Sequence, residues 1–90
     1  MVFVVERYLP GVRQRELVRS LRRLSDGNAY HTNGARVRYL DSTIVPGDEA
    51  CYCRFEAPTE AAVAEANRRA GVPFDRIVPA VTVVSKGAGR

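Results

Sequence analysis

The sequence is poor in the residue types that mark many common sites. Its 90 residues include two cysteines, one histidine and no tryptophan. No uninterrupted apolar run is longer than residues 1–5, whereas a membrane-spanning helix needs about 20 apolar residues. Glu6 and Arg7 follow that run directly and leave no room for the hydrophobic region of a secretory signal. We therefore expect no membrane span, no secretory leader and a cytoplasmic location.

The length allows one domain with a thin core. Hydrophobic residues make up 46% of the chain and charged residues 27%, which is typical of a folded globular protein rather than a disordered one. A domain of this size buries only about 60–65% of its unfolded surface, so burial against a second copy would add stability. We expect a single domain over residues 1–85, a flexible tail over residues 86–90, and a homodimer.

The positive charge of the chain is dispersed. The net charge is +4 at pH 7, and thirteen of the fourteen basic residues are arginine. A nucleic-acid-binding segment is expected to gather its basic residues in one short block, and this chain has no such block. The few aromatic residues also lack the spacing of a base-stacking sheet. Both patterns disfavour a nucleic-acid partner.

Hydrophobic patterning and turn residues predict an alternating order of strands and helices. Leu17, Leu21 and Leu24 recur at i, i+4 and i+7, which indicates an amphipathic helix. Thr59 is a typical N-cap residue, and Gly71 is typical of a helix C-terminus. The expected strands cover residues 2–9, 36–45, 50–56 and 76–84. The expected helices lie around residues 17–24 and over 60–70, with a loop at 25–34 and a hairpin turn at 46–49.

The β-α-β-β-α-β order predicts a ferredoxin-like α+β fold, in which two helices cover one face of an antiparallel four-stranded sheet. In the third strand, the apolar set Cys51, Cys53 and Phe55 should face the helices. The opposite sheet face mixes apolar, cationic and acidic side chains. Such a face is commonly covered by a second copy of the same chain, which would produce a dimeric α+β barrel.

Glu6 is the first candidate for chemistry, because it follows an apolar run in a strand and should be partly buried. A buried carboxylate must be paired or have its pKa raised, and Arg54 and Arg38 are the expected partners. With Tyr52, these residues could transfer protons on a carbonyl substrate, with Glu6, Tyr52 and Arg54 as catalytic residues. The alternative is a structural ion pair that fixes strand register or the dimer. Residues on the same strands are candidates for ligand binding: Tyr8, Arg38 and Glu56.

His31 and the two cysteines are the other candidates. His31 lies in the predicted loop, where a solvated residue is the simpler interpretation, although a loop folded over the barrel mouth would make it an acid or base. Cys51 and Cys53 have neither redox nor zinc-site spacing. In a strand their thiols would share one face about 7 Å apart along the chain, a poor geometry for a disulfide. We expect both thiols to be buried in a protein of the reducing cytoplasm. His31, Cys51 and Cys53 are only weak candidates for metal ligands.

Several short segments carry a family resemblance: ERYLPG at 6–11, VRYLDS at 37–42, CYC at 51–53, EAP at 56–58, AGVP at 70–73 and DRI at 75–77. Together they resemble a family of small bacterial ferredoxin-like proteins of mostly unknown function, which includes a nickel-binding protein. The resemblance implies a ferredoxin-like fold, a dimer of the α+β-barrel type, and nickel as a candidate metal. The chain departs from many relatives at Asn67, where they carry a histidine.

Two functions remain open at this point. The first is a small homodimeric protein that binds a small molecule or a metal ion, with nickel as the candidate metal, and performs no turnover. The second is a cofactor-free enzyme of the cyclase, isomerase or monooxygenase type. It would act on a carbonyl-bearing small molecule in a cavity between sheet and helices.

Overall fold

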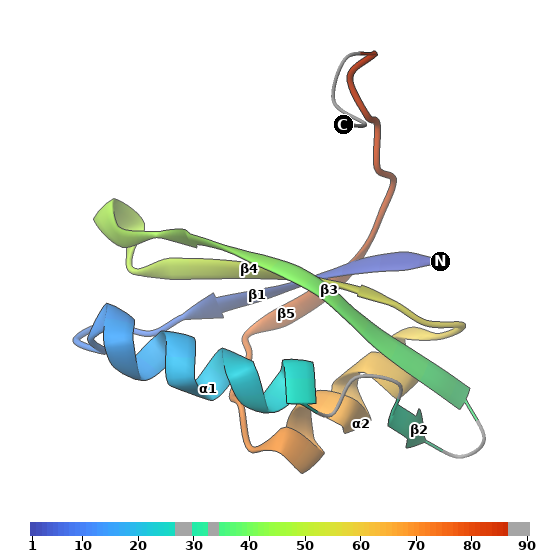
Figure 1. Cartoon of the computed structure of the whole chain (residues 1–90), viewed down its shortest axis with the longest axis horizontal. Helices are drawn as coiled ribbons and strands as arrows, with labels where there is room; N and C mark the ends of the chain where they lie inside the picture. The colour runs from blue at the N-terminus through green and yellow to red at the C-terminus, as the bar shows by residue number, and fades with distance from the viewer. Residues whose placement is uncertain (27–29, 33–34, 87–90) are drawn as a thin grey trace.

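The computed structural model describes residues 1–26, 30–32 and 35–86, and within these ranges the chain forms two α-helices and one five-stranded antiparallel sheet. The strand order is β2-β3-β4-β1-β5. The helices α1 and α2 lie on the same side of the sheet (Figure 1). The strands are β1 Val2–Tyr8, β2 Tyr30–Thr32, β3 Ala35–Val45, β4 Ala50–Glu56 and β5 Arg76–Ala80, the helices are α1 Gln14–Asp26 and α2 Glu60–Ala70, and the 3-10 turn η1 is Pro46–Asp48.

Without β2, this arrangement is the predicted ferredoxin-like fold. β4 lies between β1 and β3 and is antiparallel to each of them, while β5 pairs with the other edge of β1. The hairpin β3-η1-β4 and the helical connections therefore follow the order that the sequence predicts. The fold class is confirmed.

Helix α2 begins and ends at the predicted residues. The Thr59 hydroxyl accepts a hydrogen bond from the Ala62 amide at 3.2 Å and satisfies one free donor of the first turn. Gly71 adopts a left-handed conformation at φ 71°, which glycine tolerates without steric cost. Its amide donates to the Arg68 carbonyl at 3.0 Å and closes the last turn.

The core fills the space between the helices and the inward sheet face. Cys51, Cys53 and Phe55 are buried there, as the alternation in β4 predicts. Further core residues come from each of the main elements: Phe3 and Val5 of β1, Leu17, Leu21 and Leu24 of α1, and Val63 and Ala66 of α2.

The predicted loop at 25–34 is wrong in two respects. Helix α1 continues to Asp26, and Tyr30–Thr32 forms the short strand β2, which pairs with β3 at residues 35–37. The backbone of His31 lies opposite Arg36 in this pairing. Local turn signals predict a loop here, but the long strand β3 offers an edge to which a nearby segment can add.

The last strand ends earlier than predicted, at Ala80. Its pairing with β1 stops at Ala80 and Val2, and in the part of the chain that the structure describes no strand lies beside residues 81–84. These four residues, which we call the C-terminal arm, continue beyond the sheet (Figure 1), and Thr82 within the arm accepts a hydrogen bond from Nη1 of Arg54 at 3.2 Å. The side chains of Val81, Val83 and Val84 are 90%, 89% and 65% exposed. β-branched residues alone therefore do not make a strand where a pairing partner is missing.

Neither helix of the described ranges is long and apolar enough to cross a membrane.

Candidate functional site

Glu6 lies on the sheet face that points away from α1 and α2, which we call the outer sheet face. Its neighbours Val5 and Arg7 are fully buried on the opposite face, as the alternation of a strand requires. The Glu6 side chain is only 14% exposed, so its predicted partial burial is confirmed. Its Oε2 atom accepts a hydrogen bond at 2.7 Å from Nη2 of Arg76 on β5.

The predicted partners of Glu6 are wrong. Strand register places Arg76 directly opposite Glu6, whereas Arg54 and Arg38 have acidic partners of their own on β3 and β4. Arg54 donates from Nε and Nη2 to the two carboxylate oxygens of Asp41, at 2.8 and 2.6 Å. These bonds hold the pKa of Asp41 below its usual value. Glu6, the acidic residue that we expected to be reactive, is thus engaged in an ion pair with Arg76 on the outer sheet face.

Tyr52 lies directly across from Glu6 on β4. A hydrogen bond with Tyr8 raises the pKa of Tyr52, and the nearby Glu6 charge adds to the effect. Tyr52 and Arg54 share the outer sheet face with Glu6. The prediction that these three residues line a cavity between sheet and helices is therefore wrong, because a cavity on the helical side faces the alternate residues of the same strands. Their catalytic role stays a prediction.

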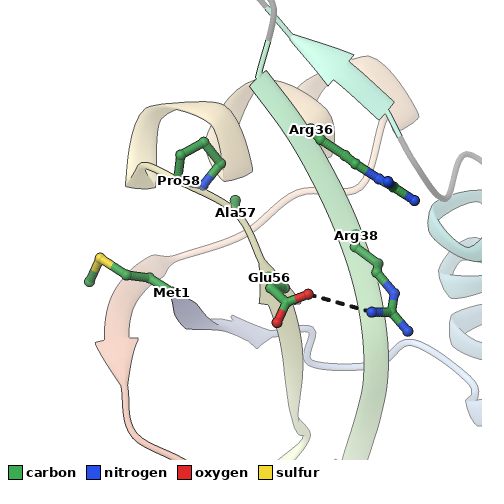
Figure 2. Close-up of a pocket in the computed structure, with 6 residues that line it drawn as sticks. All are labelled: Met1, Arg36, Arg38, Glu56, Ala57 and Pro58. Atoms are coloured by element: carbon green, nitrogen blue, oxygen red, sulfur yellow. Dashed lines mark hydrogen bonds and ion pairs between the residues drawn. The ribbon is translucent and has the colours of Figure 1, made fainter.

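A hollow of about 310 Å³ lies at the end of the sheet where β3 begins and β4 ends. Figure 2 shows Arg38 and Glu56 facing each other across it, with Nη1 and Oε1 3.5 Å apart. Both side chains are more than half exposed, and an exposed ion pair of this kind contributes little to the stability of the fold. Arg36 points away from the pair (Figure 2). Tyr8 lies at the opposite end of β1, so these three candidate ligand-binding residues do not converge.

Arg7 is a functional candidate that our sequence reasoning missed. It is fully buried, and its guanidinium crosses from β1 to the end of α2. Nη2 donates to Oδ1 of Asn67 at 2.6 Å, and Nη1 donates to the carbonyls of Pro73 at 3.1 Å and Val72 at 3.4 Å. The signal was visible in the sequence, because the alternation of Phe3 and Val5 continues to Arg7 on the core face.

The two thiols lie beside this buried arginine. Sγ of Cys51 and Sγ of Cys53 are 3.7 Å apart, and both cysteines are fully buried. The Ser42 hydroxyl donates a hydrogen bond to Sγ of Cys53 at 2.8 Å. The hydroxyl groups of Ser42 and Tyr39 are in turn 2.6 Å apart. A polar cluster thus crosses the core from Arg7 to Tyr39.

The two thiols differ in their tendency to ionise. Hydrogen bonding from Cys51, the positive charge of Arg7 and the Ser42 hydroxyl together lower the pKa of Cys53 to about 6, against the opposing effect of burial. The hydrogen bond to Cys53 and burial raise the pKa of Cys51. The surroundings therefore favour ionisation of Cys53 over ionisation of Cys51.

A cavity under α1 extends to Cys51. It has a volume of about 180 Å³, and most of its wall is apolar. Cys51 forms part of the wall, and Glu49 closes the hairpin end by accepting a hydrogen bond from the Gly11 amide at 2.8 Å. A second hollow, of about 310 Å³, lies further along α1 and is bordered by Ser42 and Tyr39. The apolar wall residues of the first cavity include Leu9, Val12, Leu17, Ile44 and Ala50.

Comparison with known proteins identifies the family. Residues 3–80 match the SCO4226-like family, described as nickel-responsive proteins. The chain belongs to this family. The crystal structure of SCO4226 from Streptomyces coelicolor A3(2) has the same fold, with a TM-score of 0.70, 20% sequence identity, and coverage of 93% of this chain and 100% of that one. No curated protein matches the chain.

The described residues of a single chain do not fit a nickel ion. Nowhere in ranges 1–26, 30–32 and 35–86 do three or more histidine, cysteine or acidic side chains gather around one point. The thiols of Cys51 and Cys53 supply two donors, but the buried cation of Arg7 beside them opposes a divalent ion in a low-dielectric interior. The side chain of His31 lies outside the described residues.

Proposed function

We propose that this protein is a small homodimeric binding protein that holds one small, largely apolar molecule in the cavity under α1. The observation that carries the proposal is the cavity itself, which is lined mostly by apolar residues. Binding sites in proteins are typically apolar hollows with a few polar groups. A cavity of about 150 Å³ in another protein accommodates benzene, so about 180 Å³ suits a molecule with one aromatic ring.

The position of the acid–base candidates supports binding rather than turnover. Glu6, Tyr52 and Arg54 lie on the outer sheet face and are separated from the cavity by the sheet itself. The polar side chains that border the cavity are Gln14, Glu49 and Cys51. Glu49 is engaged by the Gly11 amide, which leaves it poorly placed to abstract a proton from a bound molecule.

The outer sheet face and the C-terminal arm support the homodimer. Val2, Val4 and Tyr52 are half-buried on this face, between rows of ion pairs, and the three valines of the arm are largely exposed. Apolar side chains exposed in such number on a small domain are commonly covered by a partner. A second copy would present the same valines and the same paired charges, so one interface would cover both sets.

Binding in the cavity can be tested with phenol and indole as probes, followed by NMR of the backbone amides. We expect dissociation constants in the roughly millimolar range, because ligands this small have few atoms with which to bind. Val12→Trp should block the half-exposed mouth of the cavity and weaken binding at least about tenfold. Glu60→Trp, on the exposed surface of α2, is the control and should bind normally. Shifts confined to residues outside the cavity, or unchanged binding by Val12→Trp, would contradict the proposal.

A second candidate function, nickel binding, is favoured by membership of the family. Since the described residues do not fit nickel, we expect any nickel site to depend on His31, whose imidazole is a donor type that suits nickel. Calorimetric titration of the metal-free protein should then show binding that His31→Ala weakens at least about tenfold. The double variant Cys51→Ser, Cys53→Ser should bind as the parent does. Loss of binding in the double variant instead would assign the metal to the thiols and overturn our assessment of Arg7.

A further inference from the structure

Arg7 is a fully buried cation in the core of the domain. Its hydrogen-bond partners are the Asn67 amide and two backbone carbonyls, and none of the ion pairs found among the described residues includes it. Its Nε atom is buried and lacks a hydrogen-bond partner in the described part of the chain. A charge removed from water without a counter-ion is costly, so a buried arginine of this kind calls for an anion nearby.

The cysteine pair lies where such an anion is needed. Arg7 lies directly opposite Cys51 in the β1–β4 register, and Cys53 follows on the same face of β4. The hydroxyl of Ser42 approaches Cys53 from β3 on the other side. Cys53 thus accepts the Ser42 hydrogen bond and has the Cys51 thiol beside it. It also lies close to the Arg7 guanidinium, which has no acidic partner among the described residues. The arrangement is that of a stabilised thiolate beside a protonated thiol.

We propose that Cys53 is a thiolate paired with Arg7 and that hydroperoxides oxidise it reversibly. The Ser42 hydroxyl stabilises the thiolate by donating a hydrogen bond to it, and Cys51 acts as the second thiol, which completes a disulfide. This chemistry does not require the cavity to bind an organic ligand, so it stands independently of the proposed function.

In the first step the Cys53 thiolate attacks the terminal oxygen of the hydroperoxide. An S–O bond forms and the O–O bond breaks, which gives Cys53 sulfenic acid and an alkoxide, or hydroxide from hydrogen peroxide. The leaving group takes a proton from water. Sulfur loses two electrons, and the peroxide gains them.

In the second step Cys51 loses its proton, and its sulfur attacks Sγ of Cys53. The S–S bond forms as the S–O bond breaks, and the departing hydroxide combines with a proton to give water. The Sγ atoms must close from 3.7 Å to about 2 Å. Because residues two apart in a strand are poorly spaced for a disulfide, the bond is strained and readily reduced by a dithiol, which becomes a disulfide itself.

Both thiols are fully buried, so a hydroperoxide reaches them only when the structure opens locally. Cys51 is among the residues that line the cavity under α1, and Ser42, the hydrogen-bond donor to Cys53, borders the neighbouring hollow, so the local opening needed on this side is small. Burial slows the reaction of both thiols with any electrophile, so the expected reactivity depends on the stabilisation of the Cys53 thiolate by Arg7 and Ser42.

The test is to treat the reduced protein with hydrogen peroxide at pH 7 and to follow its intact mass and free thiols. The parent should lose about 2 Da and both free thiols, faster than free cysteine is oxidised, and a dithiol should restore them. Cys51→Ser should instead gain about 16 Da as a sulfenic acid that a dimedone-type reagent traps on Cys53. Cys53→Ser should react no faster than free cysteine.

The contribution of the surroundings is tested without disturbing the buried arginine. Ser42→Ala removes the hydrogen bond to Cys53 and should slow oxidation about tenfold, a typical effect for a bond to a charged group. Thr43→Ala, on the outer sheet face of the same strand, is the matched control and should react as the parent does. The proposal is wrong if the parent thiols react no faster than free cysteine, if the sulfenic acid forms on Cys51, or if the Ser42 and Thr43 variants are oxidised at the same rate.

Discussion

Replacing Asn67 with leucine should lower the free energy of unfolding by about 3 kcal/mol. The two side chains branch in the same way and leucine is the bulkier, so the change removes polarity, leaves no cavity and adds some crowding. Oδ1 of Asn67 accepts the shortest hydrogen bond of the Arg7 guanidinium, at 2.6 Å, in the fully buried interior. Leucine leaves that donor without an acceptor and leaves a buried charge with less compensation, which is among the most destabilising changes in a protein core.

Urea unfolding followed by far-UV circular dichroism measures this effect. Glu65→Gln is a suitable control, because Glu65 forms an exposed ion pair with Arg69 on the same helix and its loss should change stability by less than about 0.5 kcal/mol. If Asn67→Leu proved no more destabilising than the control, the guanidinium of Arg7 would have to find another acceptor. That result would argue against the buried polar cluster as described.

Removing residues 81–90 should weaken the proposed homodimer at least about a hundredfold. Burial of one valine side chain contributes about 1.5 kcal/mol or more. The three exposed valines of each arm would therefore contribute several kcal/mol to an interface, even after the entropy of ordering the arm is subtracted. Sedimentation velocity over a range of protein concentrations would report the dissociation constant.

The matched control is a chain that ends at Ser85, which keeps the valines of the arm and removes only the predicted tail. It should dimerise as the full chain does. Equal weakening by both truncations would assign the effect to the tail instead of the arm. A full chain that stays monomeric at high concentration would overturn the homodimer itself.

Local sequence patterns predicted the elements of the fold well, because their causes are local. The spacing of Leu17, Leu21 and Leu24 requires a helix with one buried face, and the caps Thr59 and Gly71 mark the ends of the next helix. The same reasoning placed Cys51 and Cys53 on the core face. It extended the last strand too far, since the end of β5 depends on where β1 stops pairing rather than on β-propensity.

The candidate site was less predictable, because its contacts join residues far apart in the chain. Glu6 was correctly expected to be partly buried and paired, yet its partner Arg76 lies 70 positions away and was not foreseen. The burial of Arg7 was not predicted, because arginine side chains are usually exposed. Its position two residues after Val5 nevertheless places it on the core face of β1. Its acceptor Asn67 was noted only as a departure from relatives, and not as a structural partner.

The sequence by itself determined the order of elements, the face on which each strand residue lies, and membership of a ferredoxin-like fold. These follow from periodicities of two and 3.6 residues, which any single segment displays. Only the tertiary structure decided which charges pair, which cation is buried and what lies beside the thiols. Those contacts depend on β4 inserting between β1 and β3 and on the register of each pair, and register is a property of neighbouring strands that no one segment contains.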